Sequence, residues 1–176
     1  MQYRLLGLGD NTVDTYVDRG LQFPGGNAVN VAVQAKRLGA ETGYLGCLGS
    51  DEGGMLISDA LRQEGVDTTC CRVRPGPNAR AFIGHDGQDR RFLRSERGVR
   101  GEWGAFDPED RAYIASFDLV HSSIYSELGD ALPVVRGAAR RLSYDFSERW
   151  TGENLAATLP AVDIAFLSHP SVTMFH

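Results

Sequence analysis

Apolar runs that alternate with helix-forming stretches set the strongest limit on how this chain of 176 residues can fold. The apolar runs predict strands at residues 3–10, 42–49, 67–73, 117–124, 143–147 and 162–168. The stretches between them predict helices at residues 27–38, 54–63, 107–116, 130–142 and 151–160. Alternation of this kind builds a parallel sheet with helices on both faces, so we predict an α/β fold.

Two stretches break this alternation and predict hairpins instead. Residues 12–24 alternate weakly about a turn signal at 18–20, and residues 78–95 surround Asp86-Gly87, a strong hairpin signal. We expect the two hairpins to form a small separate sheet, a lid. No internal repeat or low-complexity linker divides residues 1–176, so we expect one domain.

Composition excludes several classes of protein. The net charge of −5 leaves no basic surface for nucleic acid. No apolar run approaches the roughly 18 residues of a membrane helix, and the first residues do not form a secretion signal. Three cysteines, two of them adjacent, argue against a disulfide framework, and no Cys or His has metal-ligand spacing. We expect a cytoplasmic protein without a metal site of its own.

Two adjacent glycines, Gly25 and Gly26, precede the predicted helix 27–38. Glycine lets a ligand approach the backbone, and the first turn of a helix offers free N–H groups. Asn30 carries a donor and an acceptor, as sugar hydroxyls do. We predict that Asn27 caps this helix and that the helix is largely buried. The alternative is purely structural: these residues only begin a helix, and Asn30 is a buried, satisfied side chain.

Other nucleotide-binding and catalytic motifs are missing. A dinucleotide fingerprint needs a third glycine where Thr12 stands. The sequence contains neither a Walker phosphate loop nor the Gly-x-Ser-x-Gly motif of hydrolases.

The segment "GGNAVNVAVQAKRLGAETGYLGCLG" (25–49) resembles the first signature of the ribokinase-like sugar kinases, also called the phosphofructokinase-B family. The resemblance implies a three-layer sandwich with a mainly parallel sheet and a small β lid. It also implies phosphorylation of a sugar hydroxyl with ATP and Mg²⁺.

The resemblance also assigns substrate-binding residues. Asp14 in "GDNTVD" matches a family aspartate, and Gly25, Gly26 and Asn30 would hold the sugar with it. Arg90 in the second hairpin would lie near the substrate or the transferred phosphate. Asp14 as an ordinary turn residue and Arg90 as a solvated arginine are the alternatives.

"YDFSERW" resembles the Asp-x-Asn-x-Arg segment of the family. Asp145 and Arg149 match that pattern and would lie on the phosphate side, while Ser147 replaces its asparagine. "GDNTVDTY", "GGNAVNVAV" and "VHSSIY" are similar to fructoselysine kinases in particular. That similarity implies a ketosamine substrate, a sugar linked to the amine of an amino acid. Lid hairpins of this family often pair between subunits, so we expect a homodimer.

The catalytic base of the family lies in a Gly-Ala-Gly-Asp motif that begins a later helix, and no such motif occurs in residues 1–176. We therefore expect no catalytic residue here, with ATP and Mg²⁺ bound mainly by an absent C-terminal half. The chain reads as a truncated, inactive substrate-side part of a kinase. The alternative is a non-catalytic sugar-binding or interaction fragment.

Overall fold

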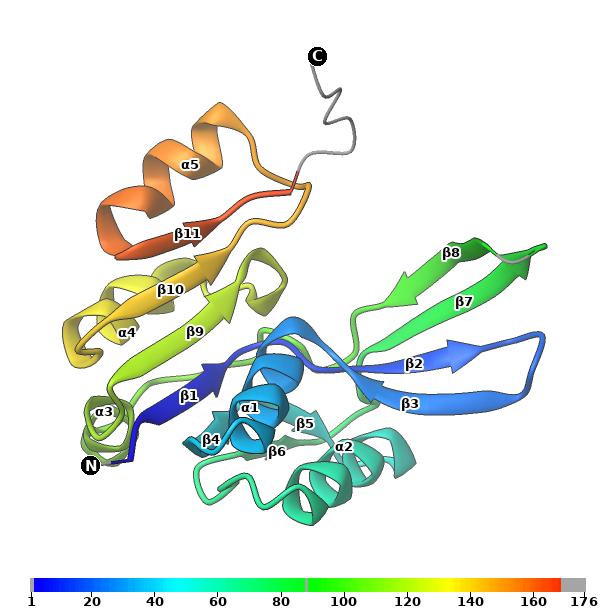
Figure 1. The fold of residues 1–176 in the computed structure, drawn as a ribbon, viewed down its shortest axis with the longest axis horizontal. Coiled ribbons are helices and arrows are strands. Elements are labelled where there is room, and N and C mark those ends of the chain that lie inside the picture. Colours follow the sequence, from blue (N-terminus) through cyan, green and yellow to red (C-terminus); the bar gives the residue numbers. More distant parts are fainter. Residues whose placement is uncertain (1, 88, 169–176) are drawn as a thin grey trace.

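A five-stranded parallel sheet forms the centre of the molecule in the computed structural model (Figure 1). The structure describes residues 2–87 and 89–168, apart from the side chains of Asp86, Asp89 and Arg90. The strands follow the order β11 (Ile164–Phe166), β10 (Leu142–Asp145), β9 (Leu119–Ser123), β1 (Arg4–Leu8) and β4 (Glu41–Leu45). The α/β fold with a mainly parallel sheet is thus confirmed.

A second sheet of four strands projects to one side of the main sheet (Figure 1). Its order is β3 (Leu21–Gly25), β2 (Thr12–Tyr16), β7 (Arg80–Asp86) and β8 (Asp89–Glu96). Strands β2 and β3 form one antiparallel hairpin, β7 and β8 form another, and β2 joins them by pairing with β7 in parallel. We call this four-stranded sheet the lid.

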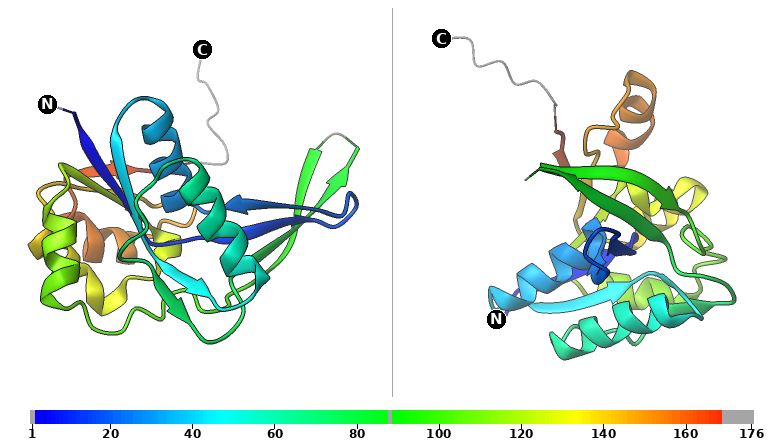
Figure 2. Two further views of the ribbon diagram at one scale, coloured as in Figure 1. Left: turned by 90° about the horizontal axis from the view of Figure 1, so that it is seen from below. Right: turned by 90° about the vertical axis from the view of Figure 1, so that its right-hand side faces the viewer.

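Helices cover both faces of the main sheet (Figure 2). On one face lie α1 (Asn27–Arg37) and α2 (Glu52–Gln63). On the other lie α3 (Pro108–Ala115), α4 (Leu132–Ala138) and α5 (Gly152–Thr158). Three short 3-10 turns, η1 (Ile124–Ser126), η2 (Gly129–Ala131) and η3 (Leu159–Ala161), join the helices to the strands.

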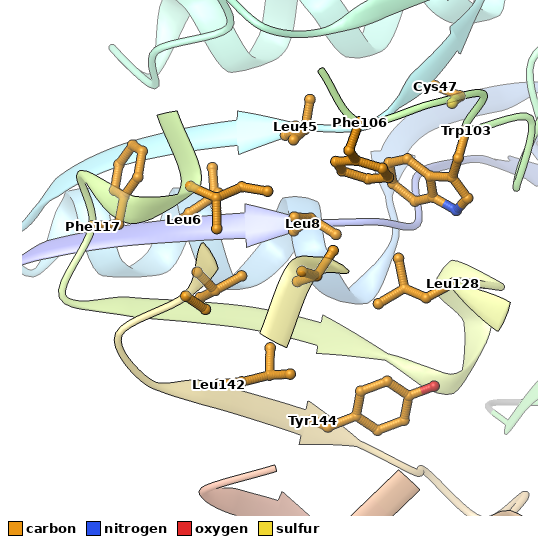
Figure 3. Packing of buried hydrophobic residues seen from close by; sticks show 14 of the residues in the cluster. Leu6, Leu8, Leu45, Cys47, Trp103, Phe106, Phe117, Leu128, Leu142 and Tyr144 are labelled. Carbon is orange, nitrogen blue, oxygen red and sulfur yellow. The ribbon is translucent and has the colours of Figure 1, made fainter. Parts of the chain in front are cut away.

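The larger core lies between the sheet and α3 and α4. Figure 3 shows Leu6 and Leu8 of β1 packed with Leu142 of β10 and with Phe117, all fully or almost fully buried. Gly7 points to the opposite face, where a Cβ would lie 2.2 Å from the carbonyl oxygen of Ala28. Side chains alternate along a strand, so β1 packs leucines on one face and lets α1 lie close on the other.

Helix α1 is buried along one face only, which corrects the prediction of a largely buried helix. Its buried residues are Ala28, Val29 and Ala32, while Leu38 at its C-cap is 89% exposed. Gly39 follows with φ of 95°, the left-handed conformation that ends helices and that glycine adopts readily.

The predicted strand at 42–49 divides in two. β4 stays in the main sheet, and β5 (Cys47–Gly49) pairs with β6 (Arg72–Arg74) in a separate sheet. The break falls at Gly46, where a Cβ would collide with the Tyr44 hydroxyl. The predicted strand at 67–73 was also too long, because the Asp67 carboxylate accepts from the Thr69 N–H at 2.9 Å and turns the chain.

Across the described residues, no helix combines the length and the apolar character that crossing a membrane would need.

Candidate functional site

A cavity of about 600 Å³ opens between the main sheet and the lid. Its walls come from the segment after β1, the start of α1, the lid strands β7 and β8, and the turns after β9 and β10. The lining residues are Asp10, Asn11, Thr12, Gly26, Asn27, Asn30, Arg80, Ala81, Phe92, Ser95, Arg100, Tyr125, Glu148 and Arg149. The carboxyl ends of three parallel strands meet here, which is where open α/β sheets bind ligands.

A buried carboxylate fixes the entrance to α1. Asp10 is only 4% exposed and accepts hydrogen bonds from the Asn27 backbone N–H at 2.5 Å and the Ser123 hydroxyl at 2.7 Å. Ser126 donates to the same carboxylate at 3.1 Å. The negative charge of Asp10 also suits the positive end of the helix dipole. Asp10 therefore joins β1, α1 and the turn after β9.

The predicted cap at Asn27 is wrong. Gly26 is the N-cap residue of α1, and Asn27 is the first residue of the helix. Because Asp10 already satisfies the first N–H groups of α1, the Asn27 side chain is released for other contacts.

The glycine doublet is required by contacts within the protein. A Cβ on Gly25 would lie 2.8 Å from the carboxyl carbon of Asp14. A Cβ on Gly26 would lie 2.6 Å from the Asp10 carbonyl oxygen, and its φ of 110° excludes most side chains. The doublet thus lets the end of β3 pass close to the segment after β1.

A chain of polar side chains runs from β9 to β10 through Asn27. The Asn27 amide donates to the Asp145 carboxylate, and its oxygen lies 2.6 Å from His121 Nε2. Since Asn27 Oδ1 can only accept, His121 carries its proton on Nε2, and Nδ1 accepts from the Ser143 hydroxyl at 2.9 Å. His121 is 5% exposed, and burial lowers its pKa, although the carboxylates of Asp145 and Asp10 oppose that shift.

The predicted sugar-binding residues lie in two neighbouring places. Gly26 and Asn30 line the cavity, and Asn30 is exposed there, which removes the alternative of a buried Asn30. Asp14 and Gly25 contact each other on β2 and β3, next to the lining residues Thr12 and Gly26 but not among them. Arg90 lies on β8, and its side chain is outside the described part of the structure.

The two residues predicted on the phosphate side differ in their surroundings. Asp145 is engaged inside the protein, by Asn27 and by the Ser147 backbone N–H at 2.7 Å. Arg149 lines the cavity and lies over the Tyr125 ring, with 5.5 Å between the guanidinium carbon and the ring centre.

Several residues of the site were not predicted from the sequence. Arg80 and Arg100 line the cavity and form ion pairs with Asp51 and Glu127, each at 3.0 Å. Asn11 is 2% exposed, and its oxygen has no hydrogen-bond partner among the described residues. Asn11 belongs to the "GDNTVD" segment that also contains Asp14, and this shared segment was the one sequence feature that pointed to Asn11.

The described residues contain no group of three or more His, Cys, Asp or Glu side chains that could hold a metal ion.

The α/β fold and the cavity beside its lid agree with the result of a comparison with known protein families. A profile of the pfkB family carbohydrate kinases matches residues 2–170. The chain belongs to the pfkB family of carbohydrate kinases.

Individual relatives are similar to this chain over most of its length. The chain is 40% identical over 168 residues to a fructosamine kinase of Bacillus subtilis and 34% identical over 166 residues to a fructoselysine 6-kinase of Escherichia coli. Each alignment covers 94% of this chain, which spans 59% and 63% of the two relatives' lengths. A crystal structure of a fructokinase with bound ATP from Xylella fastidiosa is 25% identical with a TM-score of 0.71, covering 94% of this chain and 57% of that one.

The contacts of Gly26 predict a large cost for a single methyl group. Gly26→Ala should lower the free energy of unfolding by about 2–5 kcal/mol, because the added Cβ combines backbone strain with a clash. Gly20→Ala is the matched control, since Gly20 also has a positive φ, 61°, but an added Cβ there would meet no atom within 4 Å. It should cost about 1–2 kcal/mol. Equal costs in urea denaturation would contradict the assigned packing.

Burial of His121 predicts a loss of stability in acid. At pH values below about 6.5, the pKa of an exposed histidine, His121 binds a proton in the unfolded chain but stays neutral in the folded chain. Folding therefore weakens as the pH falls through this range, by at most about 1.4 kcal/mol per pH unit from this group. His121→Gln should show a smaller loss than the parent chain between pH 7.5 and 5.5 in denaturant titrations. An identical loss in both proteins would count against a buried, neutral His121.

Proposed function

We propose that this chain is the substrate-side part of an ATP-dependent carbohydrate kinase that phosphorylates a ketosamine such as fructoselysine. One observation carries the proposal: a polar cavity bounded by Gly26, Asn30 and the lid lies at the carboxyl ends of the parallel strands. The names of the Bacillus subtilis and Escherichia coli relatives support the substrate class.

In this proposal the sugar lies between the start of α1 and the lid. Asn30 offers a donor and an acceptor to the sugar hydroxyls from the cavity wall. Asp14 lies next to that wall, beside Gly25, where a carboxylate can accept from two neighbouring hydroxyls. We also assign Arg90, a residue of β8, to the substrate or the transferred phosphate.

The chemistry needs more than these residues. A general base must remove the proton of the attacking hydroxyl, and positioned charges must stabilise the transferred phosphoryl group. The sequence contains no Gly-Ala-Gly-Asp motif to supply that base. We assign the base and the binding of ATP and Mg²⁺ to the portion of the relatives' length that this chain does not span.

The proposal includes a homodimer formed through the lid. Apolar side chains are exposed on the lid strands β3 and β8 and in the turn after β2, which suits a surface covered by a second copy. These side chains are Val17, Leu21, Phe23, Phe92 and Leu93.

Calorimetric titration with fructoselysine tests the binding half of the proposal. The chain should bind the ketosamine saturably, and Asp14→Ala should abolish binding because the paired acceptor for two hydroxyls is lost. Asp18→Ala is the matched control on the same hairpin, where Asp18 is exposed and contacts His85. Failure of the parent chain to bind, or equal binding by the two variants, would reject the assigned sugar site.

An assay of ATP depletion tests the catalytic half. Residues 1–176 should show no turnover of fructoselysine in the presence of ATP and Mg²⁺, because the general base is missing. Robust turnover by this chain alone would show that its own residues hold the base and the nucleotide.

A further inference from the structure

The turn after β10 brings two charged side chains of opposite sign to the wall of the cavity. Glu148 and Arg149 both line it, and both are exposed. The other arginines described on the wall, Arg80 and Arg100, form ion pairs, and Arg100 shares the Glu127 carboxylate with Arg97. Within residues 2–87 and 89–168, neither Glu148 nor Arg149 forms an ion pair.

The turn that carries this pair is held in a defined shape. Ser147 has a φ of 52°, unusual for a residue with a side chain, and its N–H donates to Asp145 at 2.7 Å. The Tyr125 hydroxyl donates to Ser147 Oγ at 3.0 Å, and the Ser168 N–H donates to the Ser147 carbonyl at 2.9 Å. Contacts to two other segments thus fix the backbone from which the side chains of residues 148 and 149 extend.

The Arg149 side chain is also oriented. Its guanidinium lies over the Tyr125 ring, a cation–π contact that favours one placement of the arginine. A guanidinium held in this way presents a planar fork of N–H donors, which matches the two oxygens of a carboxylate.

We propose that Arg149 and Glu148 bind the amino-acid end of the substrate, with its α-carboxylate on Arg149 and its α-ammonium on Glu148. This inference rests on the proposed function, because only a ketosamine of an amino acid brings both charges. On the cavity wall, Glu148 and Arg149 present the complements of that zwitterion. A cavity of about 600 Å³ lies within the range that holds drug-sized ligands, so it has room beyond a single sugar ring.

The family resemblance suggests a different role for Arg149, facing the transferred phosphate. The two roles differ in whether Arg149 acts without nucleotide and in whether it recognises the carboxylate of the substrate. A carboxylate-binding arginine acts on the sugar substrate when no nucleotide is present, whereas a phosphate-facing arginine does not distinguish substrates that differ only in the amino-acid carboxylate.

Calorimetry without nucleotide, on the whole 176-residue chain, separates these roles. The ligands are fructoselysine, the ketosamine of 1,5-diaminopentane, which lacks the carboxylate, and the ketosamine of 6-aminohexanoic acid, which lacks the α-amine. The parent chain should bind fructoselysine about tenfold more tightly than either analogue, the effect of one charge-assisted contact.

The variants assign each charge to its residue. Arg149→Gln should bind fructoselysine and the diaminopentane ketosamine equally, and Glu148→Gln should bind fructoselysine and the aminohexanoic ketosamine equally. Arg140→Gln is the matched control, because Arg140 is an exposed arginine before β10, whereas Arg149 follows it. Arg140→Gln should keep the full discrimination.

Each remaining outcome overturns a defined statement. Equal binding of all three ligands by the parent chain rejects the amino-acid site and leaves the sugar site standing, without depending on the folding of any variant. If Arg149→Gln still binds fructoselysine more tightly than the diaminopentane ketosamine, Arg149 does not bind the carboxylate, and a role facing the transferred phosphate is favoured. Absence of binding by every ligand rejects the proposed function, and this inference with it.

Discussion

The buried carboxylate of Asp10 is the contact on which the site depends. It accepts hydrogen bonds from the start of α1 and from Ser123 and Ser126 in the turn after β9. The three segments it joins, including the end of β1, all contribute walls to the cavity. A charge buried in this way is tolerable only when several donors satisfy it, so the carboxylate and its donors hold one another in place. Since the first two N–H groups of α1 already donate to Asp10, side chains such as Asn30 become important for recognising a ligand.

Close approach of the backbone is the second constraint. Gly7 lets α1 lie against β1, and Gly26 lets the chain pass the segment after β1. The network of Asn27, His121 and Asp145 then connects α1 to β9 and β10. This network and the buried Asp10 fix one side of the cavity, and the lid adds the remaining wall.

The strand and helix pattern, the two hairpins and the Gly25-Gly26 segment could be predicted from the sequence because they are local signals. The resemblance to the pfkB carbohydrate kinases was equally local, and the family match confirms it. The role of Asp10 could not be predicted, because its partners Ser123 and Ser126 lie more than a hundred residues away. Asn27 was taken for a helix cap because its partners His121 and Asp145 also lie far along the chain. The ion pairs of Arg80 with Asp51 and of Arg100 with Glu127 join different elements, so they could not be predicted either.

The central claim is that the cavity between α1 and the lid holds the sugar, and NMR titration of the isotope-labelled chain with fructoselysine tests it most directly. The backbone amides of Gly26, Asn27 and Asn30 should shift on binding. Those of Ser58 and Val73, which line a second cavity of about 250 Å³ beside α2, should stay unchanged. Shifts confined to the second cavity, with the start of α1 unaffected, would contradict the account.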